Sequence, residues 1–224
     1  MRHLANPVKA KLFQRYFKTG PGDYGAGDKF LGLMVPVQRI LAKKYLDLNL
    51  TELSQLIKSV WHEERLTALL ILTIQFPRAN EEMQTKIFNF YLKNIKYINN
   101  WDLIDLSAPR ILGVYLWPRD KNVLLALAKK NHLWSKRAAI LATFYFIYQG
   151  DCAWSLKLAK LLLRDKHDLM HKAVGWMLRE VGKRCGEDVE KEFLDKYATR
   201  MPRTMLRYAI EKFSEKERKK YLKM

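Results

Sequence analysis

Trp101 and Asp105 are the residues of this 224-residue chain whose types and spacing best suit chemistry. A spacing of four places both side chains on one face of a helix, where a carboxylate and an indole ring can together stabilise positive charge. Asp105 is a poor residue for a helix interior, and Pro109 lacks the N–H that would bond the Asp105 carbonyl. Residues that disfavour their own secondary structure are often found at functional sites. The alternative is an Asp near the first turn of a helix that begins at Asn100, where the helix dipole favours it.

Two further residues suit the same chemistry. Arg137 lies near the start of a predicted helix in LWSKRAAIL, as either a solvated basic residue or a clamp for a phosphate or carboxylate. Trp176 lies in HKAVGWMLREVGKR, and a Trp on an apolar helix is usually a core residue. Its neighbour Gly175 would let another group approach closely. The same helix has a basic face that suits a phosphate backbone, made of Lys172, Arg179, Lys183 and Arg184.

Metal and cofactor chemistry have little support. His167 and His171 are four apart, but the sequence between them lacks the glutamate of HExxH and no third ligand is evident, so we expect polar surface histidines. Cys152 and Cys185 have no metal-binding spacing and are expected to be reduced and incidental, which weakly indicates an intracellular compartment. The chain has no Walker loop, GxGxxG or GxSxG motif. The sequence therefore predicts no metal and no cofactor.

The charge balance points to a polyanionic partner. Lys and Arg number 41 against 23 Asp and Glu, a net charge of +18, and residues 1–50, 51–163 and 164–224 each carry +6. The excess is therefore spread over the folded body, which indicates a long cationic surface that binds nucleic acid or an anionic membrane. We find no signal peptide and no membrane-spanning stretch, and expect a cytoplasmic protein.

The elements that must position these residues are helices. Gly (10) and Pro (7) are scarce, apolar residues recur at three and four, and no period-two strand is convincing. A basic residue that opens a small-apolar helix recurs at 65, 137, 172 and 207, and Trp101 stands halfway between the first two. This period of about 35 predicts an all-α, HEAT-like helical-repeat solenoid of about a dozen helices, in a single domain 1–224. The glycine-rich stretch 19–34 is either a ligand-binding loop or a plain connector.

Four segments in order carry a family resemblance. YGAGDKFLGLMVPVQR at 24–39, WDLID at 101–105, LWSKRAAI at 133–140 and KAVGWMLREVGKR at 172–184 resemble the AlkD family of DNA alkylation repair glycosylases. The resemblance spans essentially the whole chain. It implies an all-helical solenoid of HEAT-like repeats that excises positively charged N3- and N7-alkylated purines from duplex DNA. By this resemblance Asp105 is the catalytic aspartate, Trp101 and Trp176 are the two tryptophans, Arg137 is the arginine, and Tyr24 lines the cleft.

These observations lead to one principal expectation and two alternatives. The principal one is a monomeric glycosylase that contacts duplex DNA through Tyr24, Arg65, Lys172, Arg179, Lys183 and Arg207. The alternatives are a non-catalytic nucleic-acid-binding module and a helical scaffold for an acidic protein partner. Asp105 distinguishes the first two, because a carboxylate that faces phosphates weakens plain binding. Exposure of Trp101 and Trp176 distinguishes the third, because a scaffold would bury both rings in its core.

Overall fold

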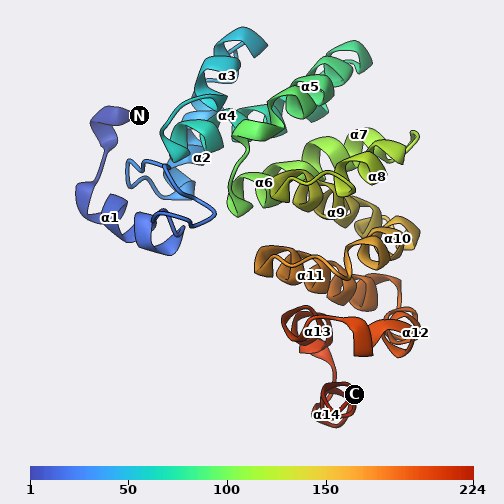
Figure 1. The fold of residues 1–224 in the computed structure, drawn as a ribbon. Helices are drawn as coiled ribbons and strands as arrows, with labels where there is room; N and C mark the ends of the chain where they lie inside the picture. The colour runs from blue at the N-terminus through green and yellow to red at the C-terminus, as the bar shows by residue number, and fades with distance from the viewer. The chain divides into compact units, whose positions relative to one another are not determined.

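The computed structural model describes all 224 residues and is entirely helical. Its one β-type feature is an isolated bridge between Lys29 and Trp61, so the expected all-α, helical-repeat class is confirmed. The chain divides into two units, Met1–Ser107 and Ala108–Met224. Fourteen α-helical segments are present, and a π-helical turn joins α6 to α7, which gives close to the expected dozen helices (Figure 1). None of these helices combines the length and the apolar character that a bilayer-spanning segment needs.

The first unit begins with a single helix and continues with helix pairs. Its helices are α1 (Pro7–Tyr16), α2 (Val35–Lys44), α3 (Leu50–Ile57), α4 (His62–Gln75), α5 (Glu81–Asn94) and α6 (Trp101–Ala108). Helix α4 is nearly enclosed, and α2 and α3 both pack against it. A capping box begins α3, where the Asn49 side chain accepts from the Glu52 backbone N–H and the Glu52 side chain accepts from that of Asn49.

A buried carboxylate anchors the glycine-rich stretch to α4. Glu63 accepts hydrogen bonds from the backbone N–H groups of Leu31, Gly32 and Leu33 at 2.8–3.1 Å. Gly32 has φ +81°, and a Cβ there would lie 2.2 Å from the Asn6 carbonyl oxygen, so only glycine fits. The end of the stretch is therefore a structural connector that binds the chain before α2 to the core.

The second unit stacks helices in two layers (Figure 1). They are α7 (Val114–Leu116), α8 (Asn122–Ala128), α9 (Leu133–Tyr148), α10 (Ala153–Leu162), α11 (Asp168–Cys185), α12 (Glu187–Tyr197), α13 (Arg203–Ala209) and α14 (Glu215–Leu222). Helix α11 packs between α9 and α13 in one layer, while α8 and α10 contact each other in the other layer. The π-helical turn Pro109–Gly113 packs on α9. A Cβ on Gly113 would lie 2.5 Å from the Ala142 carbonyl oxygen.

Side-chain contacts join the successive helices of one layer. The Arg137 guanidinium of α9 bonds the Leu169 carbonyl oxygen of α11, and Arg179 of α11 pairs with Glu211, just after α13. Arg137, Lys172 and Arg207 each occupy the fifth position of α9, α11 and α13. The 35-residue recurrence therefore marks equivalent positions of parallel helices that pack side by side.

Candidate functional site

Trp101 and Asp105 lie on one face of α6, as their spacing predicts. The helix begins at Asn100, whose carbonyl accepts from the Ile104 N–H and whose side-chain oxygen accepts from the Trp101 N–H at 2.8 Å. Both Trp101 and Asp105 are half-buried, while Leu103 and Ile104 on the other side of the helix are fully buried. The aromatic ring and the carboxylate are thus presented together at the surface of the first unit.

Aromatic packing fixes the orientation of the Trp101 ring. Phe17 stacks on it, with ring centroids 5.3 Å apart and planes inclined by 20°. Phe17 in turn stacks on Phe30 at 5.1 Å, and Tyr16 approaches the indole in an edge-on geometry at 6.0 Å. A stacked, supported indole presents its face without reorganisation, which is what electrostatic stabilisation of a cation requires.

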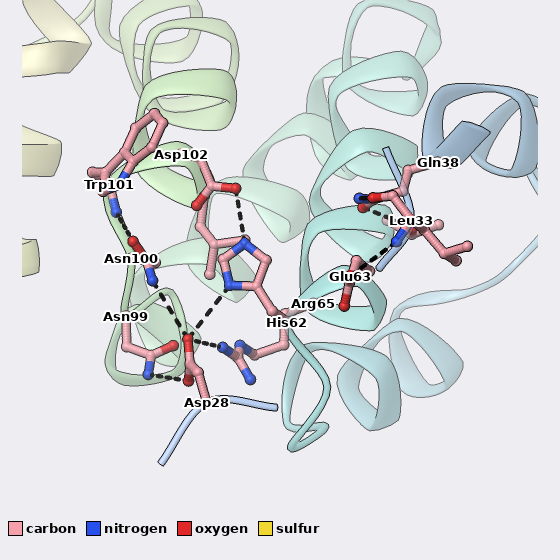
Figure 2. Close-up of polar contacts among 12 residues, drawn as sticks. Asp28, Leu33, Gln38, His62, Glu63, Arg65, Asn99, Asn100, Trp101 and Asp102 are labelled. Carbon is pink, nitrogen blue, oxygen red and sulfur yellow. Dashed lines mark hydrogen bonds and ion pairs between the residues drawn. The ribbon is translucent and has the colours of Figure 1, made fainter. Parts of the chain in front are cut away.

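A buried polar network lies beneath the start of α6 (Figure 2). His62 Nε2 is 2.8 Å from Asp102 Oδ2, and His62 Nδ1 is 3.4 Å from Asp28 Oδ2. Arg65 pairs with Asp28 at 2.8 Å. The side-chain amides of the two asparagines before α6, Asn99 and Asn100, also donate to the Asp28 carboxylate. The network joins the glycine-rich stretch 19–34, α4 and α6. It therefore fixes the position of the first turn of α6, from which Trp101 and Asp105 project.

Two carboxylates keep His62 charged within this network. Burial opposes the charge on His62, but Asp102 and Asp28 outweigh it and raise its pKa to about 9. The pKa of Asp28 is lowered: burial opposes this, and the hydrogen bond from His62 and the charge of Arg65 outweigh burial. The His62 ring lies against Phe30 at 4.7 Å and Phe17 at 4.9 Å, so the imidazolium is further stabilised by aromatic faces.

The charge of Asp105 acts on a nearby buried tyrosine, Tyr91. Burial raises the pKa of the Tyr91 hydroxyl well above its usual value, and the charge of Asp105 raises it further, against a hydrogen bond to Ser107. Ser107 Oγ donates to the Leu103 carbonyl oxygen at 2.5 Å, which leaves the Tyr91 hydroxyl to donate to Ser107 at 2.9 Å. Tyr91 thus stays protonated and is a neutral neighbour of Asp105.

Arg137 is a buried residue of the second unit. It is 5% exposed, and its guanidinium donates to the Leu169 carbonyl oxygen at 2.5 Å. The interpretation of a solvated basic residue is therefore wrong. Through this bond Arg137 joins the first turns of α9 and α11.

Trp176 lies in α11, two turns after Leu169. Its ring packs on Phe144 of α9 with centroids 5.7 Å apart, and its Nε1–H donates to Glu180 at 3.3 Å. The side chain is half-buried rather than enclosed in the core. The close approach predicted at Gly175 is made by α13, because a Cβ there would lie 2.4 Å from the Met205 carbonyl oxygen. Gly175 therefore serves helix packing.

Of the residues expected to contact DNA, Arg65 is placed where it cannot. It is 3% exposed, its guanidinium pairs with Asp28, and it donates to the Ser59 carbonyl oxygen at 2.8 Å. The expected phosphate contact of Arg65 is therefore wrong. It was expected because a basic residue at a repeat position was assumed to face outward. In α4 that position faces the chain before α2.

The remaining basic residues and Tyr24 are nearer the surface. Lys172 pairs with Asp168 at 2.7 Å, and Arg179 pairs with Glu211, so both cations already have carboxylate partners. Lys183 and Arg207 are exposed, and Tyr24 is half-buried. The basic face of α11 is thus partly neutralised within the second unit.

The two histidines at the start of α11 have structural roles. His167 Nδ1 accepts from the Leu169 N–H at 3.1 Å and caps the helix. His171 Nε2 donates to the Asp165 carbonyl oxygen at 2.6 Å. Each ring thus uses one nitrogen in a hydrogen bond to the backbone, and no group of three or more His, Cys, Asp or Glu side chains is placed to hold a metal ion.

Sequence reasoning missed the residues that support Trp101. Asp28, His62 and Asp102 come from three distant segments, and no spacing relates them. Phe17 and Tyr16 could have been noticed, because a row of apolar residues at intervals of four ends at Tyr16. A surface row of that kind is unexpected where Phe13 and the following Phe17 already pack on Phe30 from another face.

Comparison with known proteins gives a consistent result. The model of the family described as "DNA alkylation repair enzyme" matches residues 1–213. The solved structure of a predicted DNA alkylation repair enzyme from Enterococcus faecalis is similar in fold, with a TM-score of 0.71 at 16% identity, over 94% of this chain and 97% of that chain. No curated protein matches the sequence.

Proposed function

The chain belongs to the DNA alkylation repair enzyme family, and we propose that it is a DNA glycosylase that excises positively charged N3- and N7-alkylated purines from duplex DNA. The observation that carries the proposal is the presentation of Trp101 and Asp105, both half-buried, on one face of α6. Asp105 is the proposed catalytic carboxylate. The whole chain, 1–224, is the proposed repair domain.

The chemistry follows from the charge of the lesion. An N3- or N7-alkylated purine is already a cationic leaving group, so it departs as a neutral base without a general acid. Breaking the N-glycosidic bond develops an oxocarbenium-like cation at C1′. The Asp105 carboxylate stabilises that cation and orients the water that adds to C1′. The products are the free alkylated base, an abasic sugar and one proton from the water.

The aromatic residues act on the same positive charge. Trp101, supported by Phe17, offers an indole face to the lesion or the sugar, and Trp176 is proposed to do the same from the second unit. Arg137 was expected to clamp a phosphate. Its burial supports a positioning role instead, because it bonds the α11 backbone seven residues before Trp176.

The substrate is proposed to be bound through the cationic surface. The net charge of +18 supports duplex DNA as the partner, with contacts from Tyr24, Lys172, Arg179, Lys183 and Arg207. Lys172 and Arg179 would exchange their carboxylate partners for phosphates. We propose that the protein acts as a monomer in the cytoplasm, without a cofactor.

Single-turnover release of 7-methylguanine from a defined duplex tests the proposal. We expect the parent to release the base, and Asp105→Asn to reduce the rate by roughly 10²-fold or more, the scale for loss of one preorganised electrostatic contact. Asp105→Asn should bind the duplex at least as well, because it removes a repulsion with phosphates. Asp47→Asn, at an exposed position of the same unit, is the matched control. If the parent releases no base but binds the duplex, the chain is a non-catalytic DNA-binding module.

A further inference from the structure

Helix α1 carries an exposed row of apolar side chains. Val8, Leu12 and Tyr16 follow one another at intervals of four and are 72%, 58% and 65% exposed. The core-facing side of the helix is a different one, where Phe13 packs edge-on to Phe17 and Phe30. The row is therefore an apolar surface in addition to the one that attaches α1 to its unit.

Basic residues border this row. On a helical wheel Lys11 and Arg15 lie on one side of it and Lys9 on the other. The segment contains no acidic residue before Asp23. Lys11, Arg15 and Lys18 are exposed and line an open groove of about 450 Å³. Its one carboxylate, Asp23, already accepts from the Gly20 N–H at 3.2 Å. The outward face of α1 thus combines cations with apolar contact area.

The row ends at the candidate site. The Tyr16 ring lies 6.0 Å from the Trp101 ring in an edge-on geometry, and Asp105 is one turn further along α6. An anionic molecule that lay along α1 would therefore arrive at the indole and the carboxylate.

We propose that the outward face of α1 binds duplex DNA next to the lesion. Lys11, Arg15 and Lys18 bind backbone phosphates, while Val8, Leu12 and Tyr16 pack on deoxyribose and base edges. Tyr16 is a positioning residue that holds the nucleotide beside Trp101. This inference rests on the proposed function for its substrate. Nucleic acid is favoured because its backbone offers phosphates to the cations that border the row and sugars to the apolar side chains of the row itself.

A lipid surface fits the geometry less well. Helices that lie in a membrane interface bury a wide apolar face. Helix α1 has ten residues, and its exposed apolar row is one side chain wide.

Binding to an undamaged duplex across a salt series tests the cationic part. The Lys11→Gln, Arg15→Gln, Lys18→Gln variant should lower the slope of log affinity against log salt by about 3, since each phosphate contact contributes about 0.9. The control is Arg39→Gln, Lys43→Gln, Lys44→Gln on α2, which makes the same charge change at exposed positions and should alter the slope by less than about 1. Equal loss of slope in both variants overturns the assignment to α1.

Substitution of Tyr16 tests the apolar part. Tyr16→Ser should weaken affinity for a duplex with a 7-methylguanine by about 10-fold at unchanged salt slope, which corresponds to about 1.4 kcal/mol, within the range for loss of one base–aromatic contact. Tyr16→Phe should restore binding to within about twofold. Ile40→Ser, at a 68% exposed position of α2, should bind as the parent does. Parental affinity of Tyr16→Ser overturns the positioning role.

Vesicles that contain phosphatidylserine provide the competing outcome. If the α1 variants lose vesicle binding and keep duplex binding, the surface is a membrane face and the proposal is wrong. The duplex measurements need no excision. A parent that releases no base but shows the α1-dependent slope would therefore refute the glycosylase and support the α1 surface.

Discussion

His62 Nε2 lies 2.8 Å from Asp102 Oδ2, so the residue after Trp101 is tied to a buried, positively charged imidazole. Asp102 does not face the site that Trp101 and Asp105 form. It fixes the first turn of α6 from behind, together with Asp28 and the asparagines at the helix start. The site is thus positioned by an ion cluster, and its integrity depends on the protonation of one histidine.

Replacement of that histidine should have a pH-dependent cost. The folded-state pKa of His62 is raised from 6.5 to about 9. Its ionic contribution is therefore complete below pH 6.5 and is lost as the pH rises through 9. His62→Gln should lower the free energy of unfolding by about 3 to 5 kcal/mol at pH 6, since it leaves buried carboxylates unpaired. The difference should shrink by pH 9.5. Urea unfolding at the two values measures it, and a pH-independent difference would contradict the charged state.

Glu190 should show the opposite response to substitution. Burial, followed by the charge of Glu187, raises its pKa to about 8 against the charge of Arg179, and its Oε1 has no hydrogen-bond partner. The stability of the folded protein should therefore fall as the pH rises from about 4.5 to 8. Glu190→Gln should be more stable than the parent by about 1 to 3 kcal/mol at pH 8 and equal to it near pH 4.5. Thermal unfolding measures this, with exposed Asp188→Asn as control. Identical pH profiles of parent and variant would refute the raised pKa.

Arg137→Ala should act mainly on the fold. The substitution removes a buried guanidinium that bonds the Leu169 carbonyl oxygen, so the free energy of unfolding should fall by about 2 to 4 kcal/mol. Arg207→Ala changes the equivalent, exposed position of α13 and should stay within about 0.5 kcal/mol of the parent. Urea unfolding of both variants measures the difference. Parental stability of Arg137→Ala with weakened DNA binding would instead restore the phosphate clamp.

Gly175→Ala should separate helices that now touch. The added methyl would lie 2.4 Å from the Met205 carbonyl oxygen and 2.6 Å from Tyr208 Cβ. We expect a loss of about 1 to 3 kcal/mol in unfolding free energy, the range for overpacking. Gly20→Ala is the control, because there the nearest atom is a flexible Asp23 carboxylate. Calorimetry that shows equal melting temperatures for Gly175→Ala and the parent would contradict the close approach.

The helical fold was predictable because its signals lie in residues that are close together in the sequence. Helical periodicity, the scarcity of turn residues and the Asn49 capping box each follow from residues that are near in sequence. The recurrence near 35 holds for Arg137, Lys172 and Arg207, which occupy equivalent positions of three helices. It does not hold for Arg65, the fourth residue of α4, or for Trp101, the first residue of α6. The first turn of α14 is capped in the same local way, because Ser214 accepts from the Glu217 N–H.

The site was predictable only in part. Trp101 and Asp105 share a helix, so their common face follows from spacing. The prediction that Arg65 contacts DNA failed because its partner Asp28 lies 37 positions earlier, in a stretch that has no periodicity. The same holds for His62 and Phe17, whose roles arise from tertiary contacts between distant segments. No spacing rule reports a contact of that kind.

The Glu63 carboxylate has a consequence for solvent exchange. Three consecutive amides, those of Leu31, Gly32 and Leu33, donate to it although they belong to no helix and no sheet. Their protons can be released to water only when the connector leaves α4 and exposes a buried carboxylate. In a deuterium-exchange experiment these three amides should therefore be protected like helix interior positions, and they should open as one unit with α1, whose Asn6 N–H is bonded to the Leu31 carbonyl.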